Sequence, residues 1–504
     1  MRFAGGTITD NGETYDLAYA KKAMLVIVIL PLLVMYTEAM LTPALPQIQR
    51  EFVINPNDVS WILTIYLLVG TVSAAIFGKL GDMYGKKRMF LISLAFYTVG
   101  VIFNGFAPSF RWLLVSRAIQ GIGMAIFPLA FSLVREEFPP KMVPQVQGMI
   151  SAMFGVGMVI ALPLGAYVTQ HWGWRWTYHS AAPFVVLMFF LAWRVLRESR
   201  YINPGKVDWQ GALFLSWAVI PALVAVTRAP NVGWSSRETI TLFLVSIIGA
   251  IVLVLWERRS ENPLIPLDII GSRNPAIVNL GITFAAFGIS MMSQANTYIF
   301  QMPPQFGGFG KTILQSGLLM TPMAGVMLVI APLAGKVMPK IGAKPLALSG
   351  ALIASSGLAV LAKYATHMSL WQFVGIITFV GAGITLMNIS FINILVFSVP
   401  PRAMGVATGA NSLFRNFGST WGPAIAGTVM TMYYVLFQPP GAYRAIRIPT
   451  SKAYEVLFGT AAGIYIFLAL LTLAIVEVMK GGEIRTGMTK SSVDTEEEED
   501  VQVS

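Results

Sequence analysis

The sequence predicts an all-α integral membrane protein, because two features of the chain fit lipid better than water as its main solvent. Of its 504 residues, 55% are hydrophobic and only 12% are charged, too few polar groups to cover one soluble core. The apolar residues also gather into stretches of about 20, the length at which a helix spans a bilayer. A chain built from such stretches is expected to cross the membrane many times.

Fourteen stretches meet this length, and they are expected to form 14 transmembrane helices at residues 23–44, 58–78, 89–107, 111–134, 143–169, 176–196, 209–227, 239–256, 275–301, 313–334, 345–362, 369–397, 403–432 and 454–479. An even number of crossings places both chain ends on one side. Most of the 35 Lys and Arg residues fall in turns and tails on the side of the N-terminus. The positive-inside rule therefore predicts a multi-pass protein of the cell membrane with cytoplasmic N- and C-termini.

Composition also excludes several classes of function. The net charge of +11 would suit a nucleic-acid partner in a soluble protein, yet most bases here lie in turns between apolar stretches. The chain has no cysteine and three scattered histidines, so we expect no metal site and no cofactor. No P-loop, H-E-x-x-H or G-x-S-x-G pattern occurs, which argues against an enzyme.

A short charged turn separates the second and third stretches. The glycines, acid and bases that define its spacing include Gly78, Lys79, Asp82, Gly85, Lys86, Lys87 and Arg88. The same spacing returns at Gly335, Lys336, Gly342 and Lys344. The second copy has Pro339 where the first has Asp82. The repeat predicts a duplicated membrane fold in which only the first copy carries the acid.

The distance between the two turns predicts the domain organisation. The second turn follows the tenth stretch, eight helices after the first, whereas two plain six-helix halves would place it six later. Stretches seven and eight are therefore interpreted as an inserted pair. The predicted parts are a cytoplasmic segment at 1–22, a six-helix bundle at 23–197, the inserted pair with its linkers at 198–273, a second six-helix bundle at 274–480, and a disordered acidic tail at 481–504.

Two ionisable residues stand inside the predicted helices of the first bundle. Arg117 is followed by Gln120, Gly121 and Gly123. An arginine within a span costs about 2.5–3.5 kcal/mol unless it has a polar partner or reaches the interface. Glu38 is the only acid well inside a predicted span, and burial favours the neutral form of a carboxyl, so it can bind and release a proton as water access alternates. A purely structural Glu38, neutral or paired with Arg117, is the alternative.

Together these motifs resemble the major facilitator superfamily, and specifically its fourteen-helix drug:proton antiporters of the multidrug and tetracycline exporter type. The charged turn is similar to the family's G-x-L-x-D-x-x-G-[RK]-[RK] loop, and the Arg117 cluster to its R-x-x-Q-G-x-G pattern. The resemblance covers nearly the whole chain. It implies the major facilitator fold, a gating loop around Asp82 that closes the cytoplasmic side, and a role for Arg117 in proton coupling.

The glycine-rich antiporter motif of that family is only partly kept. Helix-packing residues are expected at Gln120, Gly121 and Gly123 in the fourth stretch, at Gly155, Gly157, Pro163 and Gly165 in the fifth, and at Gly422 and Pro423 in the thirteenth. The family's Gly-Pro pair, however, reads Ala161-Leu162, with the proline one residue late. This departure keeps a facilitator or symporter of the same fold open as an alternative to an antiporter.

Polar side chains in the predicted helices are candidates for a substrate cavity between the bundles. They are Tyr36, Tyr66, Gln294, Asn296, Tyr298, Gln301, Asn388, Asn393, Asn411, Arg415 and Asn416. The resemblance implies that Arg415 and its neighbouring amides line the second half of that cavity. A hydrogen bond between helices would explain any one of these residues as well.

The expected function is proton-coupled efflux of drugs or other lipophilic small molecules by alternating access. The expected partners are a small-molecule substrate, the proton and the lipid membrane, with no nucleic acid, and the protein is expected to be a monomer. A metabolite facilitator or symporter is the first alternative. A non-transporting membrane sensor or scaffold is the remote one, because it would need a folded soluble domain or an output motif.

Overall fold

The structure is a computed structural model, and its described part is almost entirely helical. It describes residues 7–10, 13–41, 44–52, 56–140, 142–199, 202, 208–260, 263–437, 446–480 and 483–484. The predicted acidic tail therefore lies outside the described residues, apart from Glu483 and Ile484.

The first bundle contains α1 (Leu17–Ala39), α2 (Leu45–Phe52), α3 (Pro56–Tyr84), α4 (Lys86–Gly105), α5 (Phe110–Ile122), the 3-10 turn η2 (Gly123–Ala125), α6 (Ile126–Glu137), α7 (Val143–Trp172) and α8 (Arg175–Val195). Helix α1 begins before the predicted start at residue 23, because the side chain of Asp16 caps it by accepting a hydrogen bond from the backbone of Tyr19 (3.0 Å). Helices α5 and α6 continue one another through η2.

The remaining helices form the inserted pair and the second bundle. The pair is α9 (Trp209–Val232) and α10 (Arg237–Glu257), followed by the short α11 (Leu267–Ile270). The second bundle contains α12 (Arg273–Gln301), η3 (Pro304–Phe306), α13 (Ile313–Ile341), α14 (Ala343–Tyr364), η4 (Ala365–His367), α15 (Leu370–Phe397), η5 (Pro401–Ala403), α16 (Met404–Met432) and α17 (Ser451–Leu473).

Three small antiparallel hairpins, which the sequence analysis did not predict, complete the described structure. Strand β1 (Thr7–Asp10) pairs with β2 (Glu13–Asp16), β3 (Tyr434–Phe437) with β4 (Ile446–Pro449), and β5 (Met479–Lys480) with β6 (Glu483–Ile484). They lie in the polar segments, where alternation over four residues or fewer gives little sequence signal. Strand β6 falls at the start of the tail that was predicted to be disordered.

Within the described residues, 12 helices are long and apolar enough to cross a membrane, against the fourteen predicted. The two predicted spans without a counterpart in that count correspond to α7 and α16, which are helices of 30 and 29 residues. Helix α16 carries Asn411, Arg415 and Asn416 near its middle, and such polar residues lower its apolar character.

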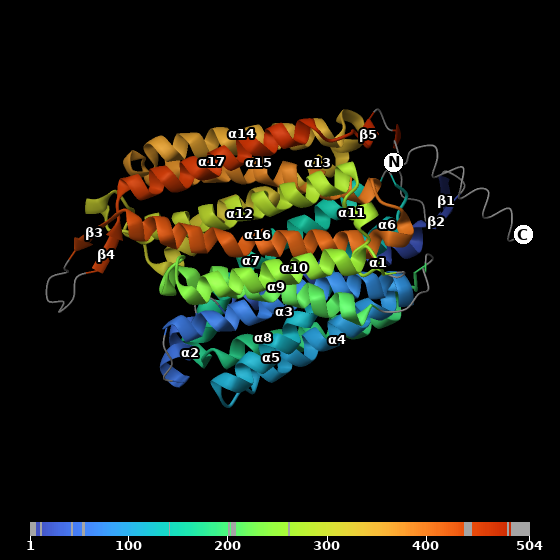
Figure 1. Cartoon of the computed structure of the whole chain (residues 1–504), viewed down its shortest axis with the longest axis horizontal. Helices are drawn as coiled ribbons and strands as arrows, with labels where there is room; N and C mark the ends of the chain where they lie inside the picture. Colours follow the sequence, from blue (N-terminus) through green and yellow to red (C-terminus); the bar gives the residue numbers. More distant parts are fainter. Residues whose placement is uncertain are drawn as a thin grey trace, which may run out of the picture.

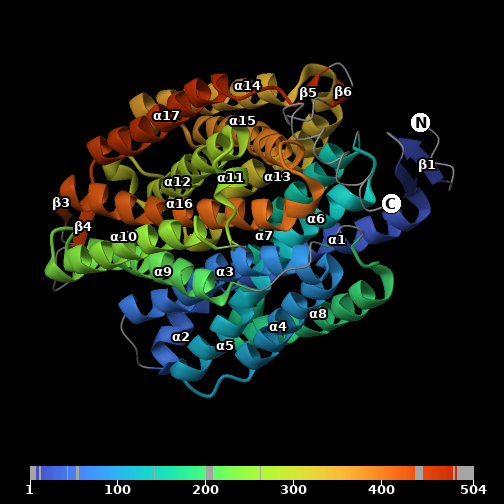
Figure 2. The same ribbon diagram turned by 45° about the vertical axis from the view of Figure 1, so that its right-hand side comes forward.

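The helices form two groups that lie side by side, with α9 and α10 along the seam between them (Figures 1 and 2). Strands β1, β2 and β5 lie at one end of the molecule, which we call the terminal end. The β3–β4 hairpin and α2 lie at the other, which we call the hairpin end (Figure 1). Helices α1, α7 and α16 run from the terminal end to the hairpin end, and α3 and α13 run back.

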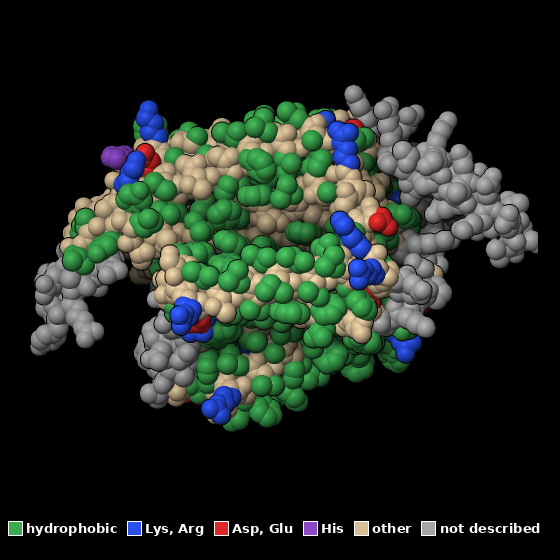
Figure 3. All heavy atoms as spheres, viewed as in Figure 1, with side chains coloured by type: hydrophobic (Ala, Val, Ile, Leu, Met, Phe, Trp, Pro, Cys, Tyr) green, Lys and Arg blue, Asp and Glu red, His purple; other side chains and the backbone are tan. Residues whose placement is uncertain are grey.

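The outer surface agrees with a membrane setting. In Figure 3, hydrophobic side chains cover the middle of the visible face, while Lys, Arg, Asp and Glu gather toward its two ends. Exposed large side chains include Leu213, Leu244, Ile248 and Ile251 on the inserted pair. A belt of this kind is expected where lipid tails meet the protein and charged groups stay at the interfaces.

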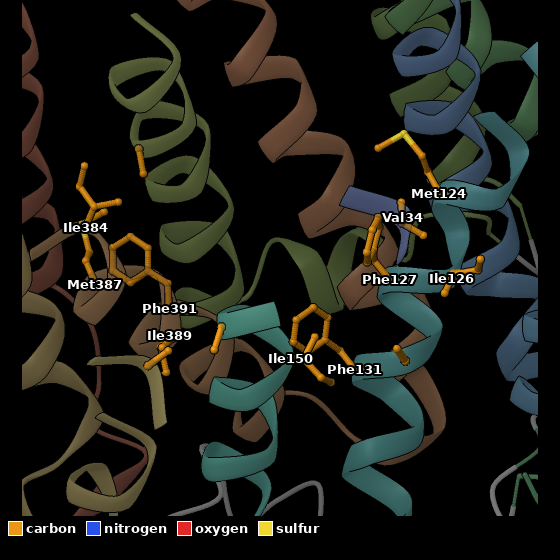
Figure 4. Packing of buried hydrophobic residues seen from close by; sticks show 14 of the residues in the cluster. Val34, Met124, Ile126, Phe127, Phe131, Ile150, Ile384, Met387, Ile389 and Phe391 are labelled. Atoms are coloured by element: carbon orange, nitrogen blue, oxygen red, sulfur yellow. The ribbon is translucent and has the colours of Figure 1, made fainter. Parts of the chain in front are cut away.

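The buried core continues through both bundles. Figure 4 shows Phe131 of α6 beside Ile150 of α7, and a second group around Met387 and Phe391 of α15. These residues belong to one large cluster of buried apolar side chains. The packing fixes the relative positions of the helices that carry the ionisable residues described next.

The inserted pair is attached to both bundles. Helix α9 shares a buried apolar cluster with Leu68 and Val72 of α3 and Leu413 of α16. Toward the hairpin end, the indole of Trp234 donates a hydrogen bond to Thr428 of α16 (2.6 Å) and stacks on Trp421. The pair is therefore packed across the seam.

Candidate functional site

An ion pair lies within the first bundle, between α1 and α5. Arg117 donates from Nη1 to Glu38 Oε1 and from Nη2 to Glu38 Oε2, both at 3.0 Å. The two parallel contacts use the planar fork of the guanidinium. They bring together the base and the acid that the sequence singled out.

Further polar groups hold Arg117 in this position. Its Nε donates to the carbonyl of Ile62 (3.0 Å), and its Nη1 also donates to Gln120 Oε1 (2.9 Å). Gln120 Oε1 accepts a second bond from Asn104 Nδ2 (2.7 Å), whose Oδ1 accepts from Ser116 (2.6 Å). Gln120 thus orients the arginine in addition to its predicted packing role. Asn104 and Ser116 were missed, because single polar residues in an apolar stretch carry no pattern.

Tyrosines surround the pair on its other sides. The ring of Tyr66 lies 4.5 Å from the Arg117 guanidinium carbon, a distance typical of a cation–π contact. Tyr97 is fully buried in α4, and its hydroxyl meets the hydroxyl of Thr37, the residue before Glu38. The structure therefore places Tyr66 at the ion pair, although it was predicted as a cavity residue.

The two partners of the ion pair differ in their access to the surroundings. The Arg117 side chain is fully buried, whereas 17% of the Glu38 side chain remains exposed. Tyr36, two residues earlier on α1, is also partly exposed. Of the two partners, the carboxylate is therefore the more accessible one.

A second cluster of charges lies at the terminal end, where α3 meets α16. Asp82 Oδ1 and Oδ2 accept hydrogen bonds from the backbone N–H groups of Gly405 (3.0 Å) and Val406 (2.9 Å). These groups open α16, so the carboxylate sits at the positive end of that helix. Asp82 belongs to the first bundle and α16 to the second, so this contact joins the two.

The charges continue from Asp82 into α4 and α6. Lys86 Nζ lies 3.3 Å from Asp82 Oδ1 and forms an ion pair with Glu136. Glu136 also accepts a hydrogen bond from Ser199 (2.7 Å). Lys86 and Glu136 are both buried. Glu136 was missed, because it lies outside the predicted spans, in the connection between 111–134 and 143–169.

Three further residues of the predicted gating loop, Gly85, Lys87 and Arg88, shape the start of α4. Gly85 has φ +99°, a conformation that side-chain-bearing residues rarely adopt. The backbone N–H groups of Lys87 and Arg88 donate to Glu198, at 3.0 and 3.2 Å. In these contacts, Lys87 and Arg88 act through their backbone at the start of α4.

The second copy of the turn has the same construction. Gly342 has φ +109°. The N–H groups of Ala343 and Lys344 donate to Glu477, both at 3.0 Å. Glu198 and Glu477 are therefore equivalent caps in the two halves, and both were missed because they lie at different distances along the chain from their turns.

Glycines bring the bundles into backbone contact at the terminal end. A Cβ on Gly78 would overlap the carbonyl of Gly405, and a Cβ on Gly409 would lie 2.6 Å from the carbonyl of Ala74. Both positions lie at the α3–α16 crossing. Ser132 and Thr408 also meet between α6 and α16, with their hydroxyl oxygens 3.1 Å apart.

The α7–α13 crossing repeats this arrangement. A Cβ on Gly335 would lie 2.5 Å from the carbonyl of Pro144, and one on Gly148 would lie 2.5 Å from the carbonyl of Ala331. Gly335 is the repeat counterpart of Gly78. All of these contacts fall in the halves of the helices nearer the terminal end, so the bundles are closed together there.

Most of the predicted helix-packing residues lie at close helix contacts. A Cβ on Gly121 would lie 2.7 Å from the carbonyl of Tyr66, and a Cβ on Gly123 would overlap the ring of Tyr97. Gly157 and Gly165 pack α7 against α1, and Gly422 packs α16 against Ser290 of α12. Gly155, Pro163 and Pro423 lie within these same two helices.

The predicted cavity residues of the second bundle fall into different settings. Asn411 donates to Asn279 of α12 (3.1 Å) and so links two helices, whereas Asn393 donates to the carbonyl of Ile389 within α15 itself (2.8 Å). Tyr298 is 46% exposed. Gln294 and Gln301 are partly exposed.

Several of these amides keep buried atoms without a partner. Both amide atoms of Asn296 are buried without a hydrogen-bond partner among the described residues. The same holds for one atom each of Asn388, Asn393 and Asn416. Buried polar atoms of this kind are uncommon in folded proteins and call for a partner.

Long apolar helices around an ionisable centre, in two bundles closed together at one end, define a polytopic membrane transporter. The sequence model of the Major Facilitator Superfamily matches residues 27–423. The chain therefore belongs to the major facilitator superfamily, whose members are transporters and not enzymes.

Relatives of known sequence are named for drug resistance. The chain is 29% identical over 411 residues to "Multidrug resistance protein Stp" of Mycobacterium tuberculosis, covering 81% of this chain and 75% of that one. It is 30% identical over 378 residues to "Multidrug resistance protein 3" of Bacillus subtilis, covering 74% and 72%. It is 24% identical over 478 residues to "Puromycin resistance protein pur8" of Streptomyces alboniger, covering 92% and 93%.

Solved structures share the fold. The human organic anion transporter MFSD10 (TETRAN) gives a TM-score of 0.62 at 14% identity, covering 90% of this chain and 99% of that one. The proton:xylose symporter XylE gives 0.64 at 13% identity, covering 94% and 98%. At this identity the likeness concerns the fold alone.

Proposed function

We propose that this chain is a secondary active exporter that exchanges an inward proton for an outward drug-like molecule. The observation that carries the proposal is the partial exposure of Glu38: although it is paired with the fully buried Arg117, 17% of its side chain stays accessible. The names of the relatives, multidrug and puromycin resistance proteins, favour drugs as the exported class. Both termini are proposed to be cytoplasmic, in a monomer.

Protonation of Glu38 is the proposed coupling step. A neutral carboxyl no longer holds both arms of the guanidinium, while Gln120 and the Ile62 carbonyl still bind it. Arg117 can then change partners without losing all of its hydrogen bonds, which limits the desolvation cost. One proton that crosses 100 mV supplies about 2.3 kcal/mol for the cycle.

The terminal-end contacts are the proposed gate. To open that end, Asp82 must leave the start of α16, and the helices must separate at the α3–α16 and α7–α13 crossings. The bundles would then rock about the region of the ion pair, as in alternating access. We further propose that α7 and α16 also cross the membrane, which restores fourteen crossings. Their lengths of 30 and 29 residues and their packing among the spanning helices support this count.

Replacement of Glu38 by Gln tests the coupling step. In proteoliposomes with a pH gradient, and with anionic, neutral and cationic fluorescent dyes as probes, Glu38→Gln should abolish proton-driven uptake, because the amide cannot release a proton. Correct folding is checked by gel filtration and by the melting temperature. Proton-driven transport at the wild-type rate would contradict the proposal.

Glu51 provides the matched control. It lies on α2 and accepts hydrogen bonds from Trp174 (2.7 Å) and Arg175. Partial burial acts to raise the pKa of Glu51, but these hydrogen bonds and the charge of Arg175 outweigh it and hold the pKa below its ordinary value. Glu51 therefore stays ionised at working pH, and Glu51→Gln should leave the coupling intact.

A symporter of the same fold is the second candidate. It is favoured by the departure from the antiporter pattern in α7, where the proline stands at Pro163, one residue after its place in the Gly-Pro pair. The sign of the proton movement separates the two. When substrate is added outside proteoliposomes that hold no substrate, an antiporter releases internal protons to the outside, a symporter takes external protons in, and a facilitator moves none.

A further inference from the structure

Arg415 differs from the other intramembrane base in having no partner of its own. It lies near the middle of α16, and its side chain is partly exposed. Arg117 has a carboxylate, a carbonyl and an amide around it. Among the described residues, the Arg415 side chain has no hydrogen bond, ion pair or ring contact. An ionisable side chain at this depth is expected to have a partner of opposite charge.

The contacts of Thr408 show which way Arg415 faces. Thr408 Oγ1 lies 3.1 Å from Ser132 Oγ and 3.0 Å from the carbonyl of Pro128, both on α6 of the first bundle. Seven residues later, Arg415 falls on the same face of α16, about 10 Å further toward the hairpin end. Seven residues further on the same face, Gly422 packs against Ser290 of α12, so Arg415 lies on the face of α16 between α6 of the first bundle and α12 of its own.

The nearby charges leave Arg415 unbalanced. Glu38 is already neutralised by its two-armed contact with Arg117. The other acids of the bundle contact lie at the terminal end, where Asp82 binds the start of α16 and Glu136 binds Lys86. The described helix faces between the bundles at the level of Arg415 thus carry a net positive charge.

We propose that Arg415 recognises the substrate, and that the exported class is amphipathic organic anions, with an apolar body and a carboxylate, sulfonate or phosphate group. This inference rests on the proposed export function and names its substrate class. The planar guanidinium fits such groups with two parallel donors.

The proposal has an electrical consequence. Exchange of one inward proton for one outward monoanion moves two charges across the membrane, whereas exchange for a neutral molecule moves one. Export of the anion should therefore depend more steeply on membrane potential. A potassium gradient with valinomycin sets this potential in proteoliposomes.

Three probes with one ring system test the recognition. They are naphthalene-2-sulfonate, naphthalene-2-sulfonamide and a naphthylmethyl-trimethylammonium salt, measured by calorimetric binding to the purified full chain. The wild type should bind the sulfonate about ten- to a hundredfold more tightly than the sulfonamide, the range of a charge-assisted hydrogen bond. Arg415→Gln should remove this preference, and Arg415→Lys should keep a part of it.

The other outcomes separate the inference from the export function. A sulfonate preference that survives in Arg415→Gln, or a wild type without any preference, overturns the role of Arg415. Equal loss of all three probes in Arg415→Gln, with an unchanged melting temperature, also overturns it, because a general structural role would act so. If the wild type binds the sulfonate as expected but transports none of the probes, the export function fails while the recognition by Arg415 stands.

Discussion

The two crossings at the terminal end are built alike in shape but not in charge. At α3–α16, Gly78 meets Gly405, and at α7–α13 its repeat counterpart Gly335 meets Pro144. Asp82 adds two hydrogen bonds to the first crossing. Pro339, at the equivalent place in α13, has no side-chain acceptor. Duplication has kept the close approach of the backbones in both halves, whereas the charged contact belongs to one.

Of the changes that test this difference between the crossings, loss of the Asp82 charge should affect transport and closure most. Asp82→Asn weakens two charge-assisted hydrogen bonds, which are worth about 1.5–3 kcal/mol each, so transport should fall about tenfold or more. Because the chain has no cysteine, closure can be measured by the disulfide formed between Ser132→Cys and Thr408→Cys, whose hydroxyls lie 3.1 Å apart. The cross-linked fraction should drop severalfold in Asp82→Asn.

Pro339→Ala is the matched control for that experiment, because it changes the same repeat position in the uncharged crossing. We expect near wild-type transport and cross-linking from it. If Asp82→Asn and Pro339→Ala behave alike, the closing contact does not depend on the charge, and the difference between the crossings has no functional weight.

Added methyl groups should affect both crossings, with a somewhat smaller effect. Gly78→Ala and Gly335→Ala each place a Cβ against a carbonyl of the opposite bundle, so both should reduce the cross-linked fraction, and to a similar degree. Gly427→Ala in α16 and Gly325→Ala in α13 are the controls, because a Cβ there meets nothing within 4 Å. A reduction at Gly78 alone would show that only one crossing closes the gate.

The smallest effects should come from the turn caps. Glu198→Gln and Glu477→Gln each weaken a carboxylate cap at the start of a helix, which contributes about 0.3–1 kcal/mol. Both variants should lower the melting temperature slightly and by similar amounts, while transport is retained. A much larger loss in one of them would mean that its carboxylate does more than cap a turn.

Much of the fold could be predicted from the sequence, because lipid makes the signal strong. Spans of about 20 apolar residues leave few alternatives to a helix, and the repeated turn marks the two halves. The predicted gating loop also lies where the two bundles meet: Gly78 and Asp82 contact α16, although the contact joins residues more than 300 positions apart.

The candidate site was less predictable for a physical reason. Glu38 and Arg117 stood out because charges are rare in spans. Asn104 and Ser116 are uncharged, and Glu136 and Glu198 lie among other charged residues near the turns, so nothing in the sequence marks them as partners. Spatial neighbours of this kind appear only when the helices are packed.

The attachment of α9 and α10 across the seam affects how easily the bundles can move. In the proposed opening of the terminal end, α3 would separate from α16, and α9 packs on both. In water this would expose apolar surface at a large cost. In a bilayer the uncovered side chains meet lipid tails that are as apolar as themselves. The cost is therefore mainly the lost van der Waals packing between the helices. In the proposed cycle, the inserted pair would therefore oppose the movement of the two bundles only weakly.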